Sequence, residues 1–246
     1  MKKLFLLSLP LLTLATMSNA QEKAKPEDTE VWEPVPEVVT PGEGTKPPSD
    51  AIVLFDGSGF ENWESVNGGE VKWKLEGDAM VVAPRTGNIQ TKKDFTDYQL
   101  HIEWRTPAKV VGEGQGRGNS GVFMQGRYEL QVLDSYDNKT YSNGQAGSIY
   151  KDGIPLVNVT LPPGEWQRYD VIYTAPRFNA DGSVKEKARI TVLHNGVLIQ
   201  NNFEIAGLTL FIGEHHYEEG GHGAGPIMLQ DHNNPTAFRN IWIREL

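Results

Sequence analysis

The chain has no cysteine among its 246 residues. A disulfide framework and a lipid-modified N-terminal cysteine are therefore both excluded. The fold must be held together by its apolar core alone. Residues 51–246 are numerous enough to form one domain with a sizeable core.

Long apolar runs are also missing, except at the N-terminus. Within residues 1–20, two lysines precede an apolar run, and small residues stand at the two positions that a signal peptidase reads. This is the pattern of a secretory signal peptide. A membrane anchor fits less well, because the run is too short to span a bilayer and contains Pro10. We expect export to the periplasm or the cell exterior, with no membrane insertion.

Positive charge is scarce. The whole chain has a formal net charge of −9, and loss of Lys2 and Lys3 with the signal peptide would make it −11. Nucleic acids and anionic membrane surfaces are poor partners for a chain this acidic.

Residues 21–50 hold six prolines among acidic residues and glycines. This composition cannot form a packed element, so it predicts a linker or an arm that lies along the domain surface. Trp32 favours the arm, because an aromatic side chain gains nothing in a free linker, but both interpretations stay open.

The remainder of the chain alternates apolar and polar residues between closely spaced Gly, Pro, Asn and Asp, as β-strands do. Asn195-Gly196 predicts a hairpin turn, since both residues accept positive φ. No segment predicts a helix longer than two turns. We expect an all-β domain over residues 51–246, a two-sheet antiparallel jelly-roll sandwich. The expected strands cover residues 52–55, 71–75, 79–83, 98–105, 121–125, 128–133, 166–174, 189–193, 227–230 and 237–243.

The segment Tyr128-Glu-Leu-Gln-Val-Leu-Asp134 holds two carboxylic acids and an amide on one expected strand. Alternation places Glu129 and Gln131 on one face and sends Leu130 and Val132 into the core. Asp134 has the wrong parity for that face. A β-bulge after Gln131 would turn it back beside Glu129.

Two further expected strands present chemically useful side chains. Glu103 and Arg105 lie on the polar face of residues 98–105, and Gln230 and His232 share one side of residues 227–232. On a curved sheet these faces could converge into a groove suited to sugar hydroxyls. The alternative is an ordinary wet outer face. Gln, His, Glu and Arg favour function over the Lys, Thr and Ser that commonly cover such faces.

Residues 116–121 match the dinucleotide fingerprint by letter, but a strand follows them instead of a helix. The glycines more simply allow Asn119 and the backbone to approach a ligand closely, or allow a mobile loop.

Residues 214–222 gather three histidines and three glutamates, which a divalent metal could use. Gly220 and Gly221 rule out a regular helix there, and no recognised ligand spacing occurs. A polar loop over the groove is the preferred interpretation.

A series of short motifs follows in order along nearly all of the mature chain: Leu54-Phe-Asp-Gly57, Trp63, Gly87-Asn-Ile-Gln-Thr91, Leu100-His-Ile-Glu-Trp104, Arg117-Gly-Asn-Ser-Gly-Val-Phe123, Tyr128-Glu-Leu-Gln-Val-Leu-Asp134, Gly147-Ser-Ile-Tyr150, Gly164-Glu-Trp166, His194-Asn-Gly196, Leu229-Gln-Asp-His232 and Phe238-Arg-Asn-Ile241. Through these motifs the chain resembles the 3-keto-disaccharide hydrolase family, which has a concanavalin A-like lectin/glucanase fold. The chain departs from the family pattern at Asn233, where glycine is usual.

This resemblance implies cleavage of glycosides whose sugar carries a ketone at C3. The ketone acidifies the C2 hydrogen, a base removes it, the C1 substituent is expelled with help from an acid, and water adds back. An arginine or a divalent metal ion, the one cofactor considered, would stabilise the oxyanion. Glu129 and His232 are the expected acid/base pair, in either order. The expected supporting carboxylates are Asp134 and Glu103, and the expected sugar-binding residues are Arg105, Asn119, Gln131, Gln230 and Tyr150.

Two other functions stay open. The spacing from Glu129 to Asp134 matches the acid motif of retaining β-glucanases with this fold, although Gln131 replaces one of its acids; a retaining mechanism needs two carboxyl groups about 5–5.5 Å apart. A non-catalytic lectin-like module would instead show exposed aromatics and no titratable pair with perturbed pKa values.

Overall fold

The computed structural model describes residues 24–246, so the expected signal peptide lies outside the described residues. The chain divides into two units, Met1–Val38 and Val39–Leu246. In the first unit, residues 24–38 are all exposed and contain one short 3-10 turn, η1 (Pro26–Thr29); Trp32 is 80% exposed. Among the described residues, no helix has the length and apolar character that crossing a membrane requires.

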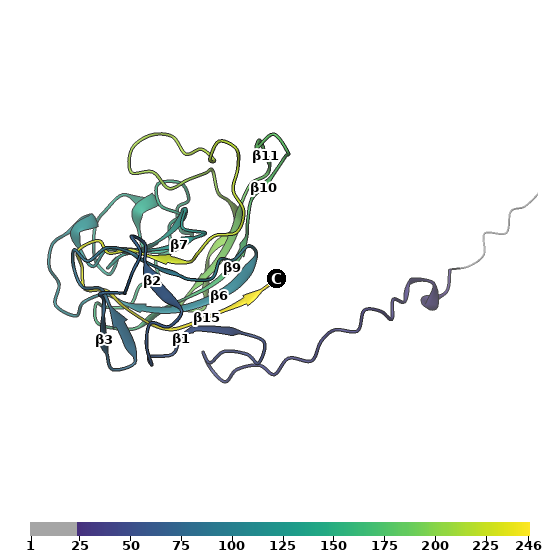
Figure 1. Ribbon diagram of the computed structural model, residues 1–246, viewed down its shortest axis with the longest axis horizontal. Helices are drawn as coiled ribbons and strands as arrows, with labels where there is room; N and C mark the ends of the chain where they lie inside the picture. The colour runs from purple at the N-terminus through teal and green to yellow at the C-terminus, as the bar shows by residue number, and fades with distance from the viewer. Residues whose placement is uncertain (1–23) are drawn as a thin grey trace, which may run out of the picture. The chain divides into compact units, whose positions relative to one another are not determined.

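The larger of two main sheets has eight strands, and Figure 1 shows β6, β9 and β15 of this sheet running side by side. Its strands follow the order β13-β12-β9-β6-β15-β4-β3, with β1 also paired to β15, and all pairs are antiparallel. The bounds are β1 (Ile52–Phe55), β3 (Lys74–Glu76), β4 (Ala79–Val81), β6 (Tyr98–Arg105), β9 (Gln167–Thr174), β12 (Arg189–His194), β13 (Val197–Glu204) and β15 (Ala237–Glu245).

The second sheet has five antiparallel strands in the order β2-β5-β14-β7-β8. They are β2 (Trp63–Ser65), β5 (Ile89–Thr91), β7 (Ser120–Met124), β8 (Tyr128–Val132) and β14 (Met228–Leu229). A separate small hairpin joins β10 (Arg177–Phe178) to β11 (Val184–Glu186), and two 3-10 turns, η2 (Gly114–Gly116) and η3 (Ser142–Gly144), lie in loops.

The core lies between the two main sheets. Each strand alternates apolar and polar residues because one of its faces packs into this core. Leu100 and Trp104 of β6 and Leu130 and Val132 of β8 are all completely buried in one apolar cluster. Removing this surface from water is the main stabilising contribution in a chain without disulfides. The expected two-sheet antiparallel sandwich is confirmed.

The predicted hairpin is also confirmed. Asn195 and Gly196 join β12 to β13 with φ angles of 52° and 82°, the left-handed region that asparagine and glycine tolerate best. The strands β2 and β5 were not predicted, and neither were the two strands of the small hairpin, β10 and β11. None of the four has more than three residues, which is too short for alternation to stand out.

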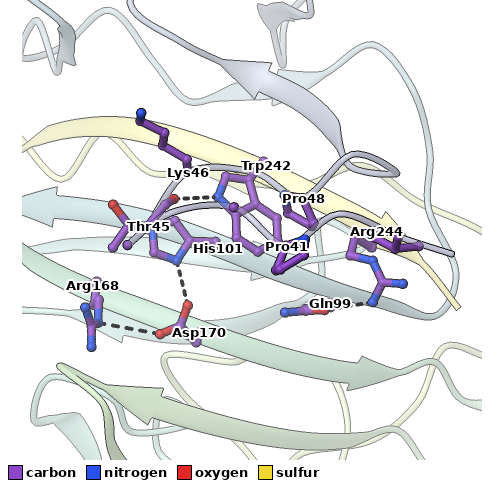
Figure 2. A pocket seen from close by; sticks show the side chains of 13 residues that line it. Pro41, Thr45, Lys46, Pro48, Gln99, His101, Arg168, Asp170, Trp242 and Arg244 are labelled. Carbon is purple, nitrogen blue, oxygen red and sulfur yellow. Dashed lines mark hydrogen bonds and ion pairs between the residues drawn. The ribbon is translucent and has the colours of Figure 1, made fainter.

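Residues 39–48 lie over the outer face of the eight-stranded sheet and line a hollow of about 550 Å³ there, which Figure 2 shows. Thr45 makes the main contacts. Its hydroxyl donates to Glu103 Oε1 over 2.9 Å, and its carbonyl oxygen accepts from Trp242 Nε1 over 3.0 Å. Underneath, the His101 ring stacks on Trp242 with 5.1 Å between centroids, and its Nδ1 lies 2.6 Å from Asp170 Oδ1. This segment therefore covers charged side chains that would otherwise lie exposed on the sheet.

Deleting residues 24–48 is expected to lower the free energy of unfolding by about 3–4 kcal/mol, because the four hydrogen bonds that join Thr45 to Glu103, Asn240 and Trp242 are lost at about 1 kcal/mol each and Trp242 gains exposure. Chemical denaturation of the two proteins at pH 7 measures the difference. Deletion of residues 24–38 alone is the control and should change the stability by less than about 0.5 kcal/mol. Equal stability of all three proteins would contradict the contribution assigned to the Thr45 contacts.

Candidate active site

The outer face of the five-stranded sheet carries Glu129 and Gln131, as the alternation of β8 predicted. Antiparallel pairing with β7 sets Phe123 opposite Glu129 and Gly121 opposite Gln131. Tyr128, Leu130 and Val132 are buried in the core. The side chains between them, those of Glu129 and Gln131, therefore point to the opposite, outer face of the sheet.

A cavity of about 290 Å³ opens on this face. Six of the nine residues expected at the site line it: Asn119, Glu129, Gln131, Tyr150, Gln230 and His232. Three further lining residues, Phe123, Thr209 and Phe211, were not expected. Phe123 was not predicted because it lies in a strand whose alternation looks like that of any other strand. Thr209 and Phe211 were not predicted because their loop contains no recognisable motif.

Glu129 provides the carboxyl group of the cavity, and its surroundings shift its pKa strongly. Its residue surface is 4% exposed, and burial raises its pKa to about 8. Gln131 stands beside it. With its nitrogen turned toward Ser120, Gln131 donates to Glu129 Oε1 over 3.2 Å and to the Ser120 carbonyl over 2.9 Å. At pH 7 Glu129 is therefore mainly a neutral acid held in a fixed position.

Gly121 leaves the space that the Glu129 carboxyl group occupies. A Cβ atom at position 121 would lie 2.4 Å from Glu129 Oε1 and 2.9 Å from the Phe123 ring. Both distances are closer than atoms approach without displacement. Any side chain at this position must therefore move the acid.

The walls of the cavity are fixed to β8 by backbone contacts. The Glu129 N–H donates to Thr209 Oγ1 over 2.9 Å, and the Tyr150 N–H donates to the Glu129 carbonyl over 3.1 Å. The hydroxyls of Tyr141 and Tyr150 lie 2.6 Å apart. Burial, the contact with Tyr141 and the nearby Glu129 raise the pKa of Tyr150 well above its ordinary value, so its hydroxyl stays neutral and able to donate.

Gln230 enters the cavity just beyond β14. Its N–H donates to the Gly121 carbonyl over 3.0 Å, and its own carbonyl accepts from Ser120 Oγ over 2.7 Å. Its side-chain Oε1 is buried and has no hydrogen-bond partner among the described residues. A ligand hydroxyl reaching this oxygen would satisfy it.

His232 is exposed at the cavity edge, and a tight turn fixes the backbone beside it. The Asp231 carboxylate accepts from the N–H groups of Thr86, Gly87 and Asn233 over 2.8–3.0 Å. Asn233 has a φ of 63°, which glycine adopts freely and asparagine tolerates. The departure from the family pattern at position 233 thus preserves the turn.

The predicted convergence is wrong for Glu103 and Arg105. Both lie on β6, and the outer face of the eight-stranded sheet points away from the outer face of the five-stranded sheet. The carboxylate of Glu103 accepts from Arg239 Nε over 2.7 Å as well as from Thr45, and Arg105 stacks on Trp166 at 4.6 Å. Alternation gives the face of a strand but not the sheet to which the strand belongs.

Asp134 does not reach Glu129 either, because the expected bulge is absent. The β7–β8 register runs without a shift from Met124↔Tyr128 to Ser120↔Val132. The strand then ends, and Asp134 forms an ion pair with Arg117, with Nε and Oδ2 2.6 Å apart. A buried carboxylate committed to a guanidinium is a structural group and not a second acid of the cavity.

The histidine-rich loop does not assemble a metal site. His215 Nδ1 lies 2.8 Å from the Leu208 carbonyl, His222 Nε2 lies 2.7 Å from the Tyr128 hydroxyl, and Glu218 pairs with Arg127. Over residues 24–246, no group of three or more His, Asp or Glu side chains is placed to hold a metal ion. The histidines and glutamates of residues 214–222 therefore do not fit the divalent metal site that their sequence suggested.

Comparison with known proteins identifies the family of the chain. A family profile described as a 3-keto-alpha-glucoside-1,2-lyase-like domain matches residues 50–244. A proposed glycosyl hydrolase from Parabacteroides distasonis, known from its crystal structure, is 53% identical; the match covers 90% of this chain and 97% of that one, with a TM-score of 0.86.

A second proposed glycosyl hydrolase from the same organism is 21% identical, with coverage of 80% of this chain and 94% of that one and a TM-score of 0.56, and so shares the fold. No curated protein matches the chain. Because the family profile spans most of the sequence, the chain belongs to the 3-keto-alpha-glucoside-1,2-lyase-like domain family.

Proposed function

We propose that this protein is an exported enzyme that cleaves 3-keto-glycosides, including 3-keto-disaccharides, by elimination followed by addition of water. The observation that carries the proposal is that a buried, neutral Glu129 and an exposed His232 line one cavity of sugar-ring size. Family membership and the similar glycosyl hydrolase of Parabacteroides distasonis support it.

In the proposed reaction His232 is the base and Glu129 is the acid. The C2–H bond breaks, its proton passes to the imidazole, and its electron pair forms an enolate with the C3 ketone. The enolate then expels the C1 substituent, whose oxygen takes the proton of Glu129. The products are an unsaturated 3-keto sugar and the free alcohol.

The return step uses the same groups in reverse. Glu129 is now an ionised carboxylate in a site that disfavours charge, so it readily accepts a proton from water as the water oxygen adds at C1. The imidazolium of His232 returns its proton to C2. Neutral donors line the cavity, and the amide of Asn119 and the hydroxyl of Tyr150 are the candidates to bind the developing oxyanion.

The two alternative functions receive less support. Retaining glycosidases need two carboxyl groups about 5–5.5 Å apart, and Glu129 is the single carboxylic acid among the described residues that line the cavity. A purely lectin-like module has no use for a buried acid whose pKa is raised to about 8.

The test compares p-nitrophenyl glucoside with its 3-keto counterpart, with and without a chelator. Release of p-nitrophenol from the oxidised substrate alone supports elimination. Release from the plain glucoside would support the retaining mechanism, and release from neither would leave binding as the function. Loss of activity with chelator would contradict a mechanism carried by side chains alone.

The raised pKa of Glu129 should also make the free energy of unfolding depend on pH. In the folded state the pKa of Glu129 is about 8, whereas the ordinary value is 4.5. The stabilisation linked to its proton is complete below pH 4.5 and is lost as the pH rises toward 8. At about 1.4 kcal/mol per pKa unit, this loss is up to about 5 kcal/mol.

Glu129→Gln should therefore match the wild type in unfolding free energy at pH 4 and exceed it by several kcal/mol at pH 9. Denaturant unfolding of both proteins across this range measures the difference. A difference that does not change with pH would show that Glu129 titrates normally.

A further inference from the structure

A second hollow, of about 810 Å³, lies beside the Glu129 cavity. Phe211 lines both spaces, so its side chain stands at their common boundary. The other wall is also continuous, because Tyr150 lines the cavity, Tyr141 lines the hollow and their hydroxyls are 2.6 Å apart. A ligand that fills the cavity can thus extend into the hollow without leaving the protein surface.

The boundary carries two apolar side chains that are largely exposed to solvent. Phe211 is 70% exposed and Ile212 is 83% exposed. Lys151 holds this loop in place, since its ammonium group donates to the Phe211 carbonyl and lies 4.2 Å from the centre of the Phe211 ring. A fixed, exposed aromatic ring next to a reactive cavity is a platform for a ligand with an apolar face.

The Glu129 cavity and the hollow differ in size, and this difference indicates that they bind different parts of a ligand. The cavity of about 290 Å³ is at the lower end of the range for small-molecule sites and suits one sugar ring, whereas the hollow is much larger. Around its apolar boundary the hollow also offers polar groups, including Asn143, Glu214 and His215. Polar groups around an aromatic platform match a second sugar ring, which has an apolar face and a rim of hydroxyls.

We propose that this hollow binds the leaving group, a pyranose ring that packs on Phe211 and Ile212 while the oxidised ring occupies the Glu129 cavity. The inference rests on the proposed function and adds to it the residues, Phe211 and Ile212, that hold the leaving group. The binding energy gained in the hollow holds the glycosidic oxygen near the acid.

The test measures kcat/KM for a 3-keto-disaccharide and for methyl 3-keto-glucoside, whose leaving group is too small to reach the hollow. The quantity compared is the ratio of the two values. Phe211→Ala and Ile212→Ser should each lower this ratio, by about 10-fold for Phe211→Ala, since aromatic side chains are enriched among the residues whose truncation costs most binding energy. Leu156→Ser, an exposed apolar position that lines neither space, is the control and should leave the ratio unchanged.

An unchanged ratio in both variants, with the wild type active on both substrates, would overturn the leaving-group site alone. A wild type inactive on both substrates would overturn the proposed function and this inference together. Circular dichroism of each variant separates a lost contact from a lost fold, and Ile212→Ser, at an 83% exposed position, keeps the test informative if Phe211→Ala unfolds.

Discussion

Replacing Glu129 by glutamine is expected to lower kcat on a 3-keto-glycoside by about 10³-fold, within the range that general acid–base groups contribute. Glutamine keeps the shape and the hydrogen-bonding contact with Gln131 but has no proton to give to the leaving oxygen. Affinity for the substrate should change less than threefold. Steady-state kinetics and equilibrium binding of the unreacted substrate to the variant measure the two effects.

Glu165→Gln is the matched control, since Glu165 is exposed and does not line the cavity. The pH dependence provides a second readout. Because burial raises the pKa of Glu129 to about 8, wild-type kcat should fall as the pH rises through that value, as the acid loses its proton. A kcat that stays constant between pH 7 and pH 9.5, or full activity of Glu129→Gln, would remove Glu129 from the role of acid.

Replacing His232 by glutamine is expected to lower kcat by about 10²–10³-fold, because the amide cannot remove the C2 proton at neutral pH. The exposed His232 has no role in the core, so the variant should keep the unfolding free energy of the wild type. His216→Gln is the control: His216 is also exposed, but it lies outside the cavity.

Hydrogen exchange at C2 gives the decisive measurement for His232. The wild type should exchange the C2 proton of a 3-keto-glycoside with deuterated water at a rate comparable to cleavage, and His232→Gln should lose this exchange. Exchange that survives in the variant would mean that another group is the base.

Local pattern was enough to predict the faces of the strands. The alternation in residues 98–105 and 128–133 places Leu100 and Leu130 in the core, and both are completely buried. Each side chain on a strand has only two possible directions, so burial of one set fixes the other. This is why Glu129 and Gln131 could be placed at a common surface from the sequence alone.

Pairing between distant strands was not predictable in the same way. β14 lies between β5 and β7, which brings Gln230 to the cavity, whereas β6 joins the other sheet and takes Glu103 and Arg105 away from it. Residues 98–105 and residues 128–133 alternate apolar and polar side chains in the same way, so the alternation does not show which sheet each strand joins. Sheet membership is decided by packing over the whole core, which a local pattern does not contain.

The position of the Asp134 side chain is set by its contact with Arg117 and not by the alternation of the strand. Its carboxylate accepts a hydrogen bond from Arg117, seventeen positions earlier in the chain, and this ion pair holds the side chain where the strand ends. Thr209 and Phe211 were missed because loop residues acquire their roles from the surface on which the loop lies.

The lack of a side chain at Gly121 offers a way to sort related sequences. Glu129 and Gly121 lie on neighbouring strands, and the acid can occupy its position only while residue 121 has no side chain. A relative that keeps the glutamate but has alanine or a larger residue opposite Gln131 cannot hold the carboxyl group in the same place. Such a protein would share the fold and the acid but should be assigned a different chemistry until it is assayed.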